Sequence, residues 1–114
     1  MKDCIFCKII KGEIPGKFFY KDKDLVVFHD ISPKAPVHVL LVPVKHIESL
    51  QYITREDEKL IGKVMAKIPE IARKLGIDDG FKIAVNNGRI AGQIVFHLHI
   101  HILGGWKRSP EWEI

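Results

Sequence analysis

The chain has 114 residues, of which 46% are hydrophobic, and a formal net charge of +4. A chain of this length can build one ordinary hydrophobic core but not two, so we expect a single domain over residues 1–114. The longest uninterrupted apolar stretch, residues 39–42, is far below the roughly 18 residues that span a bilayer, which excludes a membrane-spanning protein.

The charge is dispersed rather than clustered. Lysines alternate with acids, as in residues 20–24 (YKDKD), and this pattern is typical of a solvated surface. It argues against duplex nucleic acid as a partner. Because the N-terminus carries charge rather than an apolar leader, we also expect no membrane partner and a cytoplasmic location.

The two cysteines, Cys4 and Cys7, are separated by only two residues. In a reducing compartment this spacing indicates metal ligation or redox chemistry before a structural disulfide. Two thiolates do not complete a structural zinc site, which almost always has four ligands. The cysteine pair alone therefore does not distinguish metal ligation from redox chemistry.

The first half of the chain predicts three strands. Residues 18–20 and 25–29 are β-prone and are separated by a charged turn, so we expect them to form a hairpin. Residues 37–42 continue the sheet between Pro36 and Pro43, whose missing N–H groups favour strand ends.

One long helix is predicted between Thr54 and Leu75, where apolar residues recur at helical spacing. Thr54 is a suitable N-cap, and Gly76 follows the expected end. Pro69 lies inside this helix and should kink it or remove one backbone hydrogen bond.

Two more strands are predicted over residues 81–85 and 95–103, joined by the turn-forming residues 86–88 (NNG) and a loop that contains Gly92. The expected fold class is therefore α+β, a mostly antiparallel five-stranded sheet with one principal helix.

Residues 95–103 (VFHLHIHIL) are the most informative segment of the chain. Successive side chains of a strand point to opposite faces, so three histidines are expected on one face and four apolar residues on the other. The histidines are His97, His99 and His101, and the apolar residues are Phe96, Leu98, Ile100 and Ile102. Three imidazoles in a row are hard to explain structurally, because each has two ring nitrogens to satisfy and an unperturbed pKa of about 6.5.

Two other interpretations of this segment stay open. The histidines could simply occupy the solvent-exposed face of a strand. They could also form a metal site, since the two imidazoles of His-x-His on a strand can share one ion. Residues two apart on a strand are separated by about 6.6 Å along its axis. A third histidine in the row would struggle to reach the same ion at about 2.0 to 2.1 Å, so we do not expect a single three-histidine zinc centre.

Residues 92–105 (GQIVFHLHIHILGG) resemble the signature of the histidine triad (HIT) family. Further segments, in order and at suitable spacing, are similar to its Hint branch. These are residues 4–10, 13–15, 28–33, 35–38 and 85–86. The resemblance covers nearly the whole chain and implies the HIT-like fold, with a short N-terminal helix beside the five-stranded sheet and the long helix.

The resemblance implies an enzyme in which the middle histidine, His99, attacks the α-phosphorus of nucleoside 5′-phosphoramidates or related nucleotide conjugates. A transient nucleotidyl-histidine forms, and water then releases a purine nucleoside monophosphate. The chemistry suits a neutral imidazole, because one ring nitrogen attacks while a backbone carbonyl holds the N–H of the other and fixes the tautomer. His101 and His38 are implied as the other catalytic residues.

The resemblance also assigns the residues that bind the nucleotide. Asn86, Gln93, His99 and His101 would bind phosphate, Asp30 would bind the ribose hydroxyls, and Phe6, Phe28, His29 and Ile31 would enclose the base.

Plainer roles remain open for several of these residues. Phe6, Phe28 and Ile31 would pack into a core in any fold. Asp30 and Asn86 could simply be turn residues. The chain also departs from the family pattern, which often has serine or threonine after the glutamine, because this position is Ile94. A hydroxyl contact with phosphate is therefore lost there.

A structural zinc ion, one per chain, is implied as a cofactor by similarity to bacterial relatives. Its ligands would be Cys4, Cys7, His46 and His97. The alternative is that the cysteines are small buried apolar residues and that His46 is a surface residue.

Two other functions stay open. One is dinucleoside polyphosphate hydrolysis, as in the Fhit branch. Residues 30–33 (DISP), together with Gly104 and Gly105, favour the Hint branch instead. A zinc-stabilised nucleotide-binding or scaffold module with little turnover would use nearly the same pocket residues. The resemblance further implies a homodimer with one continuous sheet, in which residues 106–114 reach toward the partner's site.

Overall fold

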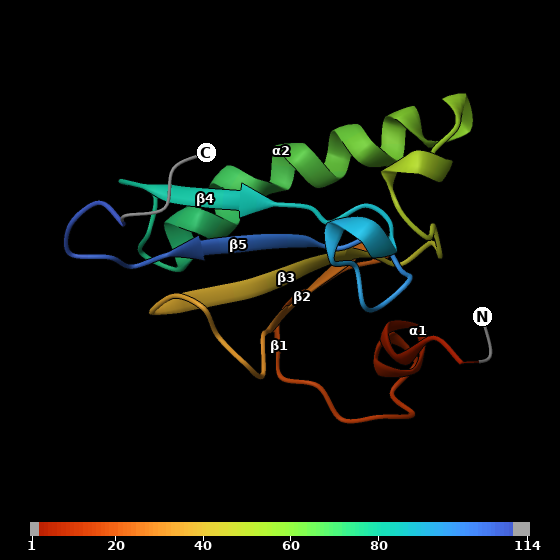
Figure 1. Cartoon of the computed structure of the whole chain (residues 1–114), viewed down its shortest axis with the longest axis horizontal. Helices are drawn as coiled ribbons and strands as arrows, with labels where there is room; N and C mark the ends of the chain where they lie inside the picture. The colour runs from red at the N-terminus through yellow and green to blue at the C-terminus, as the bar shows by residue number, and fades with distance from the viewer. Residues whose placement is uncertain (1–2, 111–114) are drawn as a thin grey trace.

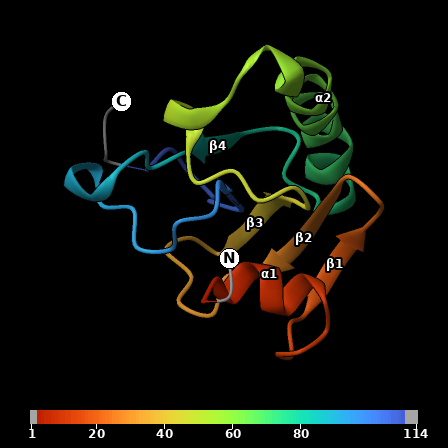
Figure 2. The same ribbon diagram turned by 90° about the vertical axis from the view of Figure 1, so that its right-hand side faces the viewer.

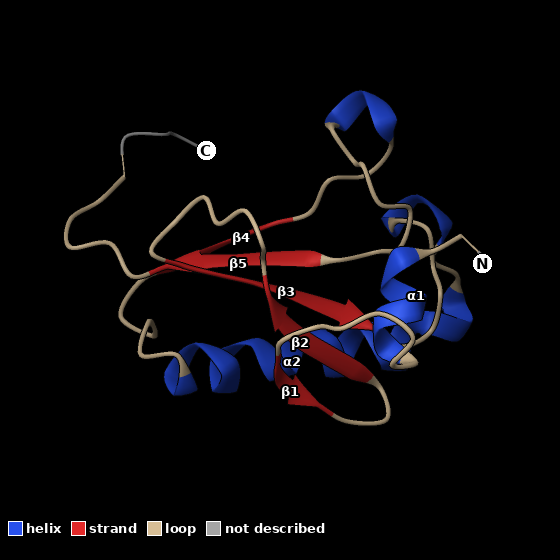
Figure 3. Cartoon of the chain, turned by 90° about the horizontal axis from the view of Figure 1, so that it is seen from below, coloured by secondary structure: helices blue, strands red, loops and turns tan. Residues whose placement is uncertain are grey.

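The computed structural model describes residues 3–110, and five strands form one antiparallel sheet in the order β1-β2-β3-β5-β4. Figure 3 shows the strands side by side. Their bounds are β1 Phe18–Lys21, β2 Leu25–His29, β3 Val37–Pro43, β4 Phe81–Ala84 and β5 Ile100–Gly104. The predicted α+β fold with a five-stranded antiparallel sheet is confirmed.

The two faces of the sheet are covered by different helices. The long helix α2, Glu58–Lys74, packs on one face, and the short helix α1, Ile5–Ile10, lies on the opposite side (Figures 1 and 2). The alternation of strand side chains decides this, because Val27 packs in the core under α2 while Phe28 packs against α1. Within residues 3–110, no helix is long and apolar enough to cross a membrane.

The long helix begins later than predicted. Thr54 caps a separate 3₁₀ turn, Arg55–Asp57, and forms a capping box in which its backbone N–H donates to Asp57 Oδ2 at 2.9 Å. The α-helix then starts at Glu58 and runs through Pro69 without interruption. Pro69 is exposed, so the carbonyl that it leaves without an intrahelical partner is on the solvent side of the helix.

Gly76 ends α2 as predicted, and the structure shows why a glycine is needed. Its φ of +73° lies in the left-handed region. The Gly76 N–H donates to the Arg73 carbonyl at 3.1 Å, and the Ile77 N–H donates to the Ala72 carbonyl at 2.9 Å. These two bonds are those of a Schellman motif, and they direct Ile77 into the core under α2.

The strand predicted over residues 95–103 is wrong in its first half, because β5 begins only at Ile100. Pro43 ends β3 and has no N–H to extend the ladder, whose last pair is Leu41 with Ile100. The N–H of Leu98 donates instead to the Ile47 carbonyl at 2.6 Å. Phe96, predicted on the apolar face of this strand, lies before β5 and is 38% exposed.

A matched pair of glycine substitutions tests this description. Gly62 is an exposed position inside α2 where an added β-carbon would meet no other atom, and alanine there should raise the free energy of unfolding by about 0.5–1 kcal/mol. At Gly76, where space is equally open but φ is positive, alanine should lower the free energy of unfolding by about 1 kcal/mol. Denaturant unfolding of both variants measures the two effects, and the same sign for both would contradict the helix boundary.

Candidate active site and metal cluster

A cleft of about 1240 Å³ opens on the side of the sheet that carries α1. Its aromatic end is lined by Phe6, Phe18 and Phe28 from α1, β1 and β2. Gly92, Ile94 and Val95, from the segment before β5, also line it. Eight predicted site residues line it together. They are Phe6, Phe28, His29, Asp30, Ile31, Asn86, His99 and His101. All the residues implied for base, ribose and phosphate except Gln93 thus share one cavity.

The His99 ring is held in a single tautomer. Its Nδ1 lies 2.7 Å from the His97 carbonyl oxygen, which can only accept, so Nδ1 carries the proton. Burial lowers the pKa of His99, and the ring is therefore neutral at pH 7. The remaining nitrogen, Nε2, keeps its lone pair in the cleft. This is the arrangement of an imidazole nucleophile.

His38 and His101 form a directed pair beside His99. The Lys34 backbone N–H donates to His38 Nδ1 at 3.0 Å, so the proton of the neutral His38 ring is on Nε2. That nitrogen lies 2.9 Å from His101 Nδ1 and donates to it. Burial lowers the pKa of His101 to about 4, so this ring is also neutral. Its proton is then on Nε2, where it can donate to an anion in the cleft.

The same bonds argue against a metal ion between Asp30, His38 and His101, although possible ligand atoms of the three lie within 4.8 Å of one another. A metal on His38 Nε2 would need the lone pair of that nitrogen. The proton would then move to Nδ1, where it would face the Lys34 N–H. This cluster is therefore a hydrogen-bonded group rather than a metal site.

Asp30 is both a turn residue and a cleft residue. Its Oδ1 accepts the Ser32 N–H at 2.8 Å, as in an Asx turn. Its Oδ2 lies 3.4 Å from His38 Nε2. The carboxylate lines the cleft, and its oxygens keep lone pairs that can accept further hydrogen bonds.

The aromatic end of the cleft is preformed. The Phe6 and Phe28 rings meet edge to face at a centroid distance of 5.4 Å, and Phe18 meets Phe28 at 6.2 Å. Phe6 also meets the His99 ring at 5.0 Å. Phe6 and Phe28 are thus core residues as well as walls of the cleft. Ile31 is different, because it is 99% exposed and has no packing role.

Gln93 is buried and lies outside the lining of the cleft. Its Oε1 accepts the Gly88 N–H at 2.8 Å, and its Nε2 donates to the carbonyls of Glu48 at 2.6 Å and Val95 at 3.0 Å. Both amide hydrogens are therefore in use. The predicted contact between Gln93 and phosphate would require one of these bonds to break.

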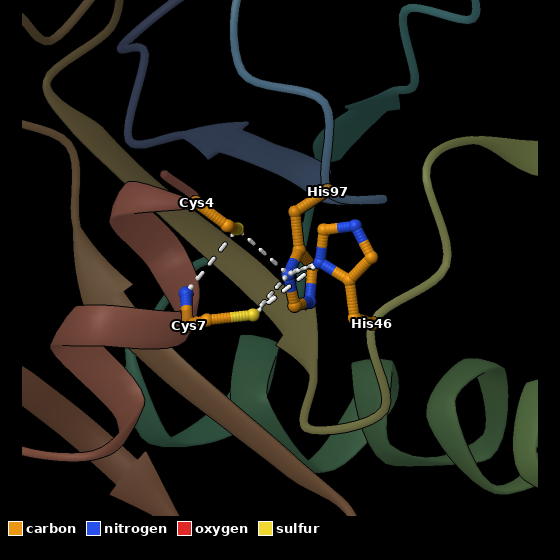
Figure 4. A group of neighbouring side chains, drawn as sticks. All are labelled: Cys4, Cys7, His46 and His97. Atoms are coloured by element: carbon orange, nitrogen blue, oxygen red, sulfur yellow. Dashed lines mark hydrogen bonds between the residues drawn. The ribbon is translucent and has the colours of Figure 1, made fainter. Parts of the chain in front are cut away.

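The four predicted metal ligands meet at one point (Figure 4). Cys4 precedes α1, Cys7 lies in α1, His46 follows β3, and His97 precedes β5. Their ligand atoms all lie within 4.8 Å of one another, and the cluster can hold a metal ion.

The spacing within this cluster is that of tetrahedral coordination. The Nδ1 atoms of His46 and His97 are 3.2 Å apart, and each lies 3.3–3.5 Å from the Sγ of Cys7. A tetrahedron with metal–nitrogen bonds of about 2.05 Å and metal–sulfur bonds of about 2.3 Å has edges of about 3.3–3.6 Å for these pairs. The atoms are thus placed where a bound ion needs them.

His97 is prepared for metal binding by its second ring nitrogen. Nε2 donates to the Pro43 carbonyl at 2.7 Å, which leaves the Nδ1 lone pair directed at the cysteines. Burial lowers the pKa of this fully buried ring to about 4, so it does not carry a proton on Nδ1 at pH 7. The Cys7 backbone N–H also donates to Cys4 Sγ at 3.4 Å.

The sequence predicted a backbone carbonyl on the N–H of the His99 ring but not that it belongs to His97. Sequence reasoning missed the other backbone groups that orient the imidazoles, namely the carbonyl of Pro43 and the N–H of Lys34. Backbone groups carry no residue-type signal, so no pattern could have indicated them. It also missed Ile5 and Phe18 in the wall of the cleft. Both side chains are more than one third exposed. Their exposure depends on how α1 and β1 pack, so the sequence gives no sign of it.

Together, the antiparallel sheet and the alternating histidines at the start of β5, of which His99 and His101 line the cleft, define a histidine triad protein. The model of the HIT domain matches residues 11–108, and the chain belongs to the HIT family.

Relatives agree with this assignment. Protein HitA of Neisseria gonorrhoeae is 52% identical over 91% of this chain and 97% of its own length. A HIT family hydrolase from Clostridium thermocellum has a TM-score of 0.91 at 39% identity, with 97% of each chain covered. A histidine triad nucleotide-binding protein from Candida albicans has a TM-score of 0.80 at 34% identity, covering 95% of this chain and 85% of that protein. The chain thus has the fold of HIT family hydrolases.

Replacing Gln93 by glutamate tests whether its carboxamide is a structural clamp. The new carboxylate would face the carbonyls of Glu48 and Val95, so the free energy of unfolding should fall by at least about 2 kcal/mol. Gln51→Glu is the matched control, because the exposed Gln51 uses its side-chain oxygen as an acceptor for Ser49. Unchanged unfolding of Gln93→Glu, with a raised KM alone, would instead support a free phosphate ligand.

Proposed function

We propose that the protein is a nucleotide hydrolase or transferase that acts on the α-phosphorus of nucleoside 5′-phosphoramidates or related nucleotide conjugates. The observation that carries this proposal is the bond from His99 Nδ1 to the His97 carbonyl, at 2.7 Å. It leaves a neutral Nε2 with its lone pair in a cleft large enough for a nucleotide. Similarity to a protein named as a hydrolase and another named as nucleotide-binding supports the same conclusion.

The reaction would proceed in two displacements. His99 Nε2 forms a bond to phosphorus, the bond from phosphorus to the leaving nitrogen breaks, and its electron pair leaves with the amine, which is protonated from water. A water oxygen then attacks phosphorus and gives one proton to the solvent. The phosphorus–Nε2 bond breaks, its electron pair returns to His99, and a nucleoside monophosphate is released.

The other histidines would stabilise charge during these steps. The His38 donor fixes His101 with a proton on Nε2, which can donate to a phosphate oxygen as negative charge builds there. Asn86 lines the same part of the cleft, and its carboxamide makes no hydrogen bond among the described residues. It is therefore available to donate as well.

The nucleoside would lie between Asp30 and the aromatic end of the cleft. The Phe6 and Phe28 rings and the exposed Ile31 offer apolar surface to a purine base, with His29 at the rim. Asp30 can accept hydrogen bonds from ribose hydroxyls through lone pairs that the Ser32 N–H does not use.

We propose that zinc is the metal of the cluster formed by Cys4, Cys7, His46 and His97. Two thiolates and two imidazoles at tetrahedral spacing are the donor set of structural zinc sites. The ion would connect α1 to the segments that follow β3 and precede β5, and its role would be structural. The free thiols of the two cysteines also fit a reducing compartment such as the cytoplasm.

A homodimer is a further part of this proposal. Strand β4 lies at the edge of the sheet and bonds on one side to β5. Ile83 in this strand and Met65 in α2 are both more than 40% exposed, so a second copy could cover apolar surface at this edge. Residues 111–114 of the C-terminal segment assigned to the dimer lie outside the described residues.

His99→Ala should abolish turnover of an adenosine 5′-phosphoramidate, with a fall in kcat of at least about 10³-fold, because no other group replaces the nucleophile. Binding of adenosine monophosphate should stay within about tenfold of wild type. His29→Ala, at the rim of the same cleft, is the matched control and should raise KM more than it lowers kcat. If His99→Ala kept a tenth of the wild-type rate, the nucleophile would be another group.

Protein purified without a polyhistidine tag should contain about one zinc ion per chain. His46→Ala should lose the ion, whereas His38→Ala should keep it, because His38 belongs to the hydrogen-bonded group. Chelation should lower the thermal midpoint of unfolding, because structural zinc contributes folding free energy. Elemental analysis decides the matter, and zinc that persists after Cys4→Ser with Cys7→Ser would refute the site.

A further inference from the structure

The metal cluster has an accessible half and a buried half. Cys4 and His46 are partly exposed, whereas Cys7 and His97 are buried. Cys4 and His46 also line a hollow of about 320 Å³ beside the cluster. A small solute that enters this hollow reaches the Cys4 side chain, while Cys7 lies shielded below the surface. The cluster is therefore open on the side of one cysteine.

The two cysteines are placed for a disulfide bond with each other (Figure 4). They are three residues apart, with Cys4 as the N-cap of α1 and Cys7 in its first turn. Cα atoms at this spacing on a helical turn are separated by about 5 Å, inside the range of about 4.4–6.8 Å that disulfides need. The two Sγ atoms lie within 4.8 Å of each other. Rotation of the side chains can thus bring the sulfurs together.

We propose that Cys4 and Cys7 are a redox-active pair, which a peroxide joins in a disulfide bond, with loss of the metal ion and loosening of the aromatic wall of the cleft. The chain has only two cysteines, so no other disulfide can form within it. Exposed Asp3 and Glu48 also line the hollow and repel an anionic oxidant, whereas hydrogen peroxide is small and neutral. The loss of the ion rests on the zinc site proposed above, but the disulfide itself does not.

The accessible cysteine reacts first in this sequence. Cys4 Sγ attacks one oxygen of the peroxide, the O–O bond breaks, and the departing hydroxide takes a proton from solvent to become water. This step leaves a sulfenic acid on Cys4. Cys7 Sγ then attacks the Cys4 sulfur, the S–O bond breaks, and the second hydroxide is also protonated to water. Two electrons thus pass from the two thiolates to the peroxide, which becomes two molecules of water.

The disulfide changes the cluster and the cleft together. Its sulfurs carry no thiolate charge, and two histidines alone are too few ligands for a structural zinc site, which takes four. Phe6 lies between the two cysteines in α1, and its ring meets Phe28 at 5.4 Å and His99 at 5.0 Å. A helix of six residues depends on tertiary contacts for its position. Without the ion, α1 holds this ring less firmly, and a nucleotide binds more weakly.

Treatment of the purified wild-type protein with hydrogen peroxide tests the pair directly. Each chain should lose both thiols and the mass of two hydrogen atoms, and its zinc should pass to a chromophoric chelator. The dissociation constant of adenosine monophosphate should rise severalfold, as it should when the ion is chelated from the reduced protein. A dithiol reductant with added zinc should restore the mass, the metal and the affinity.

Single variants test the order of attack. In Cys7→Ser, oxidation should stop at a sulfenic acid on Cys4, which dimedone traps, because no second thiol follows. In Cys4→Ser, the shielded Cys7 should react with peroxide at least about tenfold more slowly than Cys4 does in Cys7→Ser. Both variants keep the two methionines of the chain, so they also measure any methionine oxidation by the same treatment.

His46→Ala separates the disulfide from the metal. This variant should lose the ion but keep both thiols, and peroxide should still join them. Wild-type protein that contains no zinc but forms the disulfide would refute the proposed metal, while the redox pair would stand. If adenosine monophosphate does not bind to the reduced protein, the proposed function fails, and the mass and thiol measurements still test the pair.

Three results would overturn the inference. Peroxide could leave both wild-type thiols free, or it could oxidise Cys4 beyond the sulfenic acid without forming a disulfide. In either case the cysteines are not a redox pair. If the disulfide forms while the zinc content and the affinity for adenosine monophosphate stay at the values of the reduced protein, the pair does not control the cluster or the cleft.

Discussion

The end of β3 at Pro43 is the constraint on which both sites depend. Because Pro43 has no N–H, the ladder between β3 and β5 stops at the pair of Leu41 and Ile100, and residues 97–99 are free of the sheet. The Pro43 carbonyl then accepts the Nε2 proton of His97, whose own carbonyl accepts the Nδ1 proton of His99. His97 thus belongs to both sites, because its ring lies in the metal cluster and its carbonyl bonds to His99, the proposed nucleophile.

This arrangement explains how several histidines are buried together without mutual repulsion. Burial lowers the pKa of His38, His97, His99 and His101, so the rings are neutral at pH 7. Each neutral ring then has one donor and one acceptor nitrogen. The Lys34 N–H and the carbonyls of Pro43 and His97 determine which nitrogen of the bonded ring carries the proton. Among the described residues, no buried side-chain nitrogen or oxygen lacks a partner. Neutrality also keeps the His99 lone pair available for bond formation.

The metal cluster and the cleft are coupled through α1. Cys7 and Phe6 are neighbours in this short helix, and they contribute to the cluster and to the aromatic wall respectively. A helix of this length gains little stability from its own hydrogen bonds, so its position depends on tertiary contacts. An ion bound at the cluster would hold α1 against the segment that carries the triad, and would thereby fix the aromatic wall of the cleft.

Much of the fold was predictable because each element has a local signal. Runs of β-prone apolar residues in β2 and β3 indicate the sheet, and the helical spacing before Gly76 indicates α2. Pro43 marks the end of its strand. The start of the last strand was not predictable, because histidines and apolar residues already alternate before Ile100. In the structure, the Leu98 N–H bonds to the carbonyl of Ile47 in a loop, and the His97 ring lies against the cysteines.

The site was predictable to a similar degree. The motif indicates which side chains gather in the cleft, but the role of Gln93 depends on backbone groups far away in the sequence, such as Glu48. Ile94 shows the reverse case, since its departure from the family pattern was visible in the sequence while its exposed position in the wall of the cleft was not.

The stereochemical course at phosphorus tests the central claim, a covalent intermediate on His99, most directly. A single isomer of an adenosine 5′-phosphorothioamidate hydrolysed in ¹⁸O-labelled water gives a product whose configuration can be determined. Attack by His99 followed by attack of water involves two inversions, so we expect net retention of configuration. Net inversion would show a single direct attack by water and would contradict a nucleotidyl-histidine intermediate.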